Sequence, residues 1–129
     1  MAVSHQFYTD HNILLTTWSG TLQESELLRD YMGIYNHSQW HPGYNEIIDL
    51  RDADLSQLSN DALNHLSGLT ASCLGGNQIK LAIIAPSELS TDIARLYQAF
   101  THIPNESTYL CHHLDEALQW LHAFASNDS

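Results

Sequence analysis

Two different spacings of hydrophobic residues alternate along this chain. Short runs rich in β-branched and aromatic residues favour strands, and longer stretches with an apolar residue every three or four positions favour amphipathic helices. The short runs predict strands at residues 5–9, 13–19, within 44–55, 79–85 and 107–111. The longer stretches predict helices at residues 21–37, 59–73, 87–103 and 114–124.

The strand within residues 44–55 is the most informative stretch. Its core, Ile47, Ile48 and Leu50, is short, branched and apolar, which is typical of a strand buried on both faces of a parallel sheet. Its carboxyl end is expected to be loop-like and is crowded with charge: Asp49, Arg51, Asp52 and Asp54. Ligands meet open α/β sheets at that end, so these carboxylates are either a cation or general-base cluster or, as favoured, acceptors for loop amides.

Helix start and stop signals mark several boundaries. Thr21 and Glu24 have the spacing of a capping box, so the first helix is expected to begin there. Ser59 is the predicted cap of the second helix, with Asp61 in its first turn. Gly75 follows that helix as its predicted stop signal.

The predicted element order is β-β-α-β-α-β-α-β-α. Alternating strands and helices imply parallel strands joined by right-handed crossovers. The chain of 129 residues has the length of one domain. We therefore expect a single-domain α/β fold over residues 1–129, with a mixed, mostly parallel sheet of four or five strands backed by helices and with the last few residues disordered.

Composition excludes several classes of function. The chain has 4 Lys plus Arg against 15 Asp plus Glu, a net charge of −11. Such a surface repels nucleic acid and anionic membranes, so neither is an expected partner. Cys73 and Cys111 lack zinc-site spacing and are expected to be buried thiols in a reducing compartment. Without a recognisable signal peptide or a run long enough to span a membrane, the predicted location is the cytoplasm.

No motif of enzyme or cofactor chemistry stands out. The glycine pair before Asn77 lacks the spacing of a nucleotide-binding loop, and there is no nucleophile elbow. The pairs His37 and His41 and His112 and His113 are the best metal candidates, but neither is expected to present two ligands on one helix face. We expect no enzyme activity, no metal and no cofactor.

Aromatic residues on the apolar stripes of the first and third helices suggest a ligand pocket. Tyr31, Tyr35, Tyr97 and Phe100 are the predicted ligand-binding residues. Tyrosine combines an apolar body with a hydroxyl that needs a partner when it is buried, which suits a small lipophilic or amphipathic ligand. The competing interpretation is ordinary core packing.

A series of motifs resembles one bacterial family. The segments "NEIIDLRDAD", "LSNDALNHL", "IKLAIIA", "DIARLYQAF" and "LDEALQWL" occur in order along nearly the whole chain. Together they resemble the SpoIIAA-like (STAS-like) family of small bacterial proteins. The resemblance implies a fold similar to anti-sigma-factor antagonists and to the lipid-binding core of CRAL-TRIO proteins, in a binding or signalling module rather than an enzyme.

One departure from the antagonists defines the alternative function. They carry a phosphorylated serine in an Asp-Ser-Xaa-Gly turn, whereas "DADLSQLSND" has two serines but no Asp-Ser pair and no glycine. The alternative is therefore a protein-interaction module without the usual phosphoserine motif. Its predicted partner-binding residues are Asp54, Ser56, Ser59 and Arg95. The two open sheet edges also predict a homodimer.

Overall fold

The computed structural model describes residues 2–88, 90–104 and 106–127, with side chains up to residue 121. The strands are β1 (Val3–Tyr8), β2 (Ile13–Thr21), β3 (Asn45–Asp54), β4 (Ile79–Ile84) and β5 (Glu106–Cys111), and the helices are α1 (Glu24–Tyr35), α2 (Asn60–Leu74), α3 (Thr91–Thr101) and α4 (Leu114–Asn127). The predicted α/β class and element order are confirmed. The prediction of a disordered terminus concerns residues that lie partly outside the described ranges.

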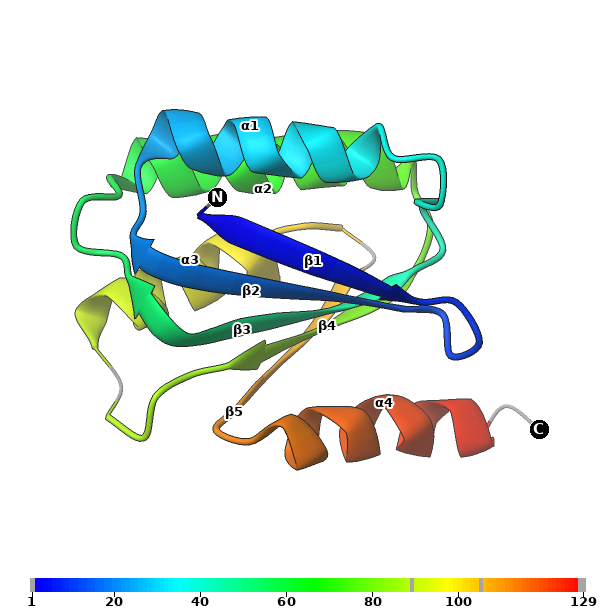
Figure 1. Cartoon of the computed structure of the whole chain (residues 1–129). Helices are drawn as coiled ribbons and strands as arrows, with labels where there is room; N and C mark the ends of the chain where they lie inside the picture. The colour runs from blue at the N-terminus through cyan, green and yellow to red at the C-terminus, as the bar shows by residue number, and fades with distance from the viewer. Residues whose placement is uncertain (1, 89, 105, 128–129) are drawn as a thin grey trace.

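All five strands form one sheet in the order β1-β2-β3-β4-β5. β1 is antiparallel to β2, and the other neighbours are parallel. Helices α1 and α2 lie above the sheet and α4 lies below it in Figure 1. Helix α3 packs against α2 and β5 on the same side as α1 and α2. The chain therefore has a three-helix face and a one-helix face.

The central strand β3 serves both faces, as its apolar core predicts. Ile48 and Leu50 belong to the large core under α1, α2 and α3. Ile47 points the other way and belongs to the small core under α4. This alternation is the period-two pattern of a strand with both sides covered.

The prediction that the carboxyl end of this strand is a loop is wrong. β3 continues through the charged residues to Asp54, because β2 also continues and pairs with it up to Thr21 opposite Asp54. A register shift after Thr17 and a positive φ of 70° at Gly20 allow that continuation. Gly20 therefore lies inside a strand instead of ending one.

The predicted caps of the first two helices have different outcomes. The capping box at Thr21 is wrong, because Thr21 lies in β2 and α1 begins after Gln23, whose side chain makes no capping bond. The cap at Ser59 is confirmed, because its hydroxyl accepts a hydrogen bond from the Ala62 amide at 3.1 Å. Gly75 ends α2 in the left-handed conformation, as predicted.

Helix α3 is shorter than its predicted range of 87–103. It begins at Thr91, and the preceding residue, Ser90, caps it by accepting a hydrogen bond from the Ile93 amide. Among the described helices, none is long and apolar enough to cross a membrane.

Candidate functional site

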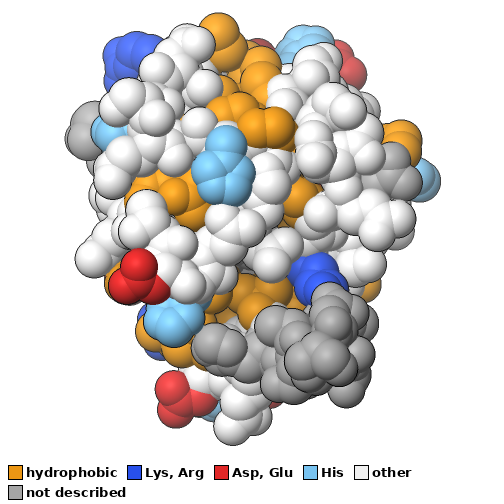
Figure 2. Space-filling model, turned by 90° about the vertical axis from the view of Figure 1, so that its right-hand side faces the viewer, with side chains coloured by type: hydrophobic (Ala, Val, Ile, Leu, Met, Phe, Trp, Pro, Cys, Tyr) orange, Lys and Arg blue, Asp and Glu red, His pale blue; other side chains and the backbone are white. Residues whose placement is uncertain are grey.

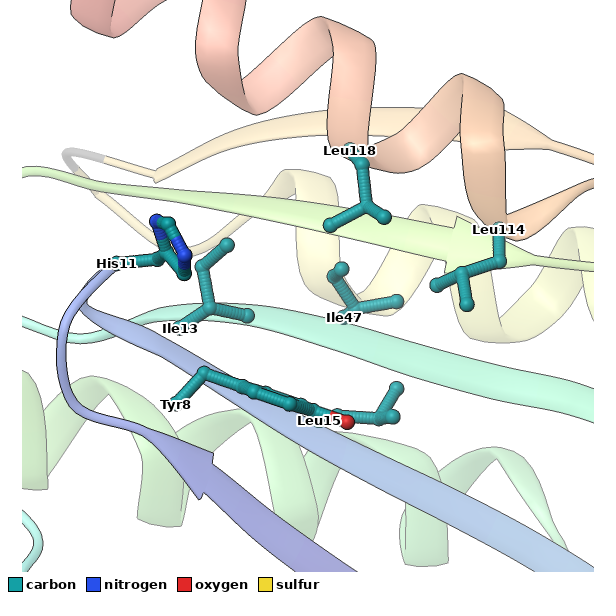
Figure 3. A pocket seen from close by; sticks show the side chains of 7 residues that line it. All are labelled: Tyr8, His11, Ile13, Leu15, Ile47, Leu114 and Leu118. Carbon is teal, nitrogen blue, oxygen red and sulfur yellow. The ribbon is translucent and has the colours of Figure 1, made fainter.

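An apolar groove lies on the one-helix face, between the β1–β2 turn and α4. Its volume is about 290 Å³. In Figure 3, Leu114 and Leu118 reach down from α4 toward the sheet, where Ile13 and Ile47 face them. The full lining is Tyr8, His11, Ile13, Leu15, Ile47, Leu114 and Leu118.

The groove exists because one helix cannot cover a sheet of five strands. Helix α4 contacts β3, β4 and β5, and its buried Ala117 and Leu121 complete the small core there. Leu15 of β2 lies beyond this cover and is only half-buried. Figure 2 shows this end of the molecule, whose surface has few charged side chains and carries hydrophobic and histidine side chains among the other residues.

Polar side chains lie at the turn beside the groove and, outside the groove lining, further along β3. At the turn, the Tyr8 side chain is 40% exposed and its hydroxyl donates to Gln6 Oε1 at 3.1 Å. Further along β3, Arg51 donates two hydrogen bonds to the Asp49 carboxylate, from Nε at 3.0 Å and from Nη2 at 2.8 Å. Burial raises the pKa of Asp49, but the hydrogen bonds from Arg51 outweigh it and lower that pKa overall.

None of these lining residues was predicted from the sequence to bind a ligand. The alternation of Ile13 and Leu15 along β2 gives two apolar side chains on one face of the strand. The sequence offers a single helix after the last strand to cover that face. Counting helices against strands for each face was the signal that could have found the groove.

The predicted ligand residue Tyr31 is part of a closed hydrogen-bond network. Its hydroxyl donates to Glu46 Oε2 at 2.8 Å and accepts from Trp18 Nε1 at 3.1 Å. Thr16 also donates to Glu46 Oε2, at 2.9 Å. Solvent exposure of these four side chains is at most 6%. The network therefore joins α1 to β2 and β3 within the core and has no open access for a substrate.

The other predicted ligand residues lie in different surroundings. The Tyr35 ring lies 5.8 Å from the Tyr31 ring, and its hydroxyl lies 2.8 Å from Thr70 Oγ1 of α2. Phe100 is buried in the large core. Tyr97 is half-buried and lines a shallow cleft with Ala94, Gln98 and Leu110. Tyr31 and Tyr35 are in contact, but the described pockets do not join the four side chains around one cavity.

Two glutamates were not singled out from the sequence: Glu46 is buried in the large core, and Glu106 is half-buried on the edge strand β5. Burial raises the pKa of Glu46 to about 7, although hydrogen bonds from Tyr31 and Thr16 act in the opposite direction. Burial, and then the charge of Glu46, raise the pKa of Glu106 to about 8. Glu106 Oε1 and Thr108 Oγ1 are buried without a hydrogen-bond partner among the described residues. Neutral carboxyl groups at these positions avoid the cost of two buried charges.

The predicted partner-binding residues gather around the β3–α2 loop. Asp54 Oδ1 accepts the Ser56 amide at 2.9 Å. Arg95 Nη2 donates to the Leu58 carbonyl at 2.9 Å, next to the capping Ser59. The Arg95 side chain also bonds to Asn60 and Asp92. It thus joins the start of α3 to the start of α2.

The candidate metal residues have other roles in the described structure. His37 Nδ1 accepts the Gln39 amide at 3.0 Å, and the His41 ring stacks on Tyr44 with centroids 4.2 Å apart. His112 Nδ1 lies 3.2 Å from the Ala85 carbonyl oxygen. No three His, Cys, Asp or Glu side chains of the described residues are grouped to hold a metal ion.

No family model matches this chain, and no curated protein matches its sequence. The resemblance to the SpoIIAA-like family stays a prediction based on the motifs quoted above. The site must therefore be interpreted from its own geometry.

Proposed function

We propose that this protein is a binding module that takes up a small apolar or amphipathic molecule without chemical turnover. The single observation that carries the proposal is the apolar groove between the β1–β2 turn and α4. This location replaces the pocket expected around Tyr31, whose hydroxyl and ring are engaged in the core.

The size of the groove limits the ligand. Its volume of about 290 Å³ is close to the lower end of roughly 300–1,000 Å³ for small-molecule sites. It is nearly twice the engineered cavity of about 150 Å³ that binds benzene. A bicyclic aromatic compound or the end of a short acyl or isoprenoid chain suits this volume better than a whole phospholipid.

The lining explains why an amphipathic ligand fits. Aliphatic side chains from β2, β3 and α4 surround the floor, and Tyr8 and His11 stand at the turn. An apolar body can replace water over Leu15 and Leu118, which gains about 25 cal/mol per Å² of covered apolar surface. A polar head can remain near the phenol and imidazole groups at the turn.

The test is a ligand panel on the native protein. Native mass spectrometry and thermal shift with fatty acids, isoprenoids and small aromatic compounds should identify at least one adduct. A ligand at a hundredfold excess over its Kd should stabilise the fold by about 2.7 kcal/mol. Leu118→Trp should fill the groove and abolish both signals.

The matched control is Met32→Trp on α1. Met32 is 46% exposed and lies on the opposite side of the sheet, so this variant should bind the ligand normally. Binding that survives Leu118→Trp, or a panel without any adduct or shift, would contradict the proposal.

A second candidate is the protein-interaction module, centred on the β3–α2 loop. The observation that favours it is the fixed shape of this loop, held by Asp54 at one end and Arg95 at the other. Ser56 is exposed between these contacts. A negative result with the ligand panel would leave this loop as the better-supported binding surface.

A further inference from the structure

Strand β5 forms an open edge of the sheet. It pairs with β4, from Ile79 opposite Glu106 to Ile84 opposite Cys111, and it is the last strand in the sheet order. Half of the N–H and C=O groups of an edge strand point away from the sheet and can pair with another strand. Such an edge selects an extended backbone as its partner.

Most of β5, from residue 107 to residue 111, lacks the features that block pairing with another strand. Residues 107–111, "STYLC", contain no charged residue and no proline. Charged side chains and proline are common means of protecting an edge. In a chain with 15 acidic residues, this uncharged strand offers nothing that would select a basic partner. A second uncharged strand is the better match.

The opposite edge of the sheet differs. β1 exposes three polar side chains in succession, Ser4, His5 and Gln6. The amide of Val3 at its start already donates to Asp30 Oδ2 at 3.0 Å. The two edges thus differ in the polarity of their side chains, and β5 is the edge more suited to association.

Half-buried aromatic groups flank β5 on both faces. On the α4 side, the Tyr109 ring stacks on Trp120, with centroids 5.1 Å apart. On the α3 side, Tyr97 and Leu110 border a cleft of about 240 Å³. A strand-edge contact alone is small against the roughly 1,200 Å² that specific interfaces bury. The flanking rings can supply additional apolar contact area.

We propose that β5 pairs with the β5 of a second copy in antiparallel fashion about a two-fold axis at Tyr109. Directly opposed residues in an antiparallel pair share a face of the sheet. A register centred on Tyr109 places Leu110 opposite Thr108 of the second copy and Cys111 opposite Ser107. It also leaves Glu106 outside the paired segment. The result is a continuous sheet across a homodimer.

Net charge gives the pairing a recognisable salt dependence. Each copy carries −11, so two copies repel one another over the whole surface, although the paired segments of residues 107–111 are uncharged. Salt reduces the Debye length to about 8 Å at physiological ionic strength. The dimer should therefore strengthen as salt is added, whereas an interface of opposite charges would weaken.

The first experiment measures mass in solution. Light scattering over a concentration series should show a shift from one to two chain masses, at lower concentration in higher salt. Tyr109→Glu places two carboxylates opposite one another at the axis and should shift the midpoint to at least tenfold higher concentration. Ser107→Glu serves as a second variant if Tyr109→Glu does not fold, which circular dichroism shows. Gln6→Glu on β1 should leave the midpoint unchanged.

The second experiment traps the register. In a background with Cys73→Ala and Cys111→Ala, Tyr109→Cys should form a disulfide-linked dimer on oxidation. Opposed Cα atoms lie about 4.5–5.5 Å apart, within the usual disulfide range. Gln6→Cys is the control and should form no disulfide-linked dimer on oxidation. A monomer at every concentration, a dimer disrupted by Gln6→Glu instead, or a monomer that pairs with another protein's strand would overturn the proposal.

Discussion

The two faces of the sheet are covered by helices to different extents. The face under α1, α2 and α3 is closed over β2 and β3, where even polar groups such as Glu46 and Thr16 are buried and hydrogen-bonded. The face under α4 is closed over β4 and β5 but open over β2, where Leu15 borders the groove. A closed face stabilises the fold, whereas an incompletely covered face can bind something else.

The difference originates in β3, whose successive residues serve the two faces. Ile48 contacts the closed core, and Ile47 lines both the small core and the groove. A ligand in the groove would therefore contact the central strand directly. Binding there can stabilise the whole sheet without any change in the closed face.

The largest expected effect comes from truncating a side chain on each face. Ile48→Ala should lower the free energy of unfolding by about 2–5 kcal/mol, because it leaves a cavity in a core that cannot collapse. Leu118→Ala should cost only about 1 kcal/mol, since Leu118 is half-buried beside existing space. Urea denaturation measures both. Equal costs would show that the α4 face is packed as tightly as the other.

The second-largest expected effect is a pH dependence of the free energy of unfolding, which comes from carboxyl groups on the three-helix face. Glu46 keeps its proton in the folded state up to a pKa of about 7, against 4.5 when unfolded. The folded state binds more protons in that window, so the free energy of unfolding falls as pH rises through it. The loss is about 3 kcal/mol. Glu106 acts in the same direction up to about pH 8.

Glu46→Gln tests the source of this dependence. The variant cannot ionise, so its stability should change less between pH 5 and pH 7 than that of the wild type. Urea titrations at low protein concentration are required near the pI of about 4.9. Glu88→Gln, at an exposed position between β4 and α3, is the control and should keep the wild-type slope. An unchanged slope in Glu46→Gln would assign the dependence to other groups.

The fold could be predicted because its signals are local. The run around Ile48 and the cap at Ser59 each determine an element through their own neighbours. The capping box at Thr21 failed because pairing with β3 extended β2 over the same residues. Tertiary pairing overrode a local preference there, and only the register of two distant strands reveals it.

The site could be predicted only in part because pockets depend on what is left uncovered. The apolar stripe with Tyr31 indicated a buried tyrosine correctly, but its hydroxyl partner, Glu46, lies 15 residues away along the chain. Periodicity shows which side chains turn inward and does not show whether the interior is filled. The groove at Leu15 arises from the position of α4 over β3, β4 and β5, which no local pattern encodes.

The smallest expected effect is the sharpest test of the two faces, because it compares adjacent residues of β2. Leu14 is 1% exposed in the closed core, so Leu14→Phe adds volume where none is available and should cost about 1–3 kcal/mol. Leu15 points to the groove, so Leu15→Phe can extend into existing space and should change stability by less than about 0.5 kcal/mol. Urea denaturation at one pH measures both variants under the same conditions. The Leu15→Phe variant should also lose ligand binding, since the added ring occupies the groove. Comparable destabilisation by the two substitutions would mean that the groove is closed in solution and that the one-helix face is no more open than its opposite.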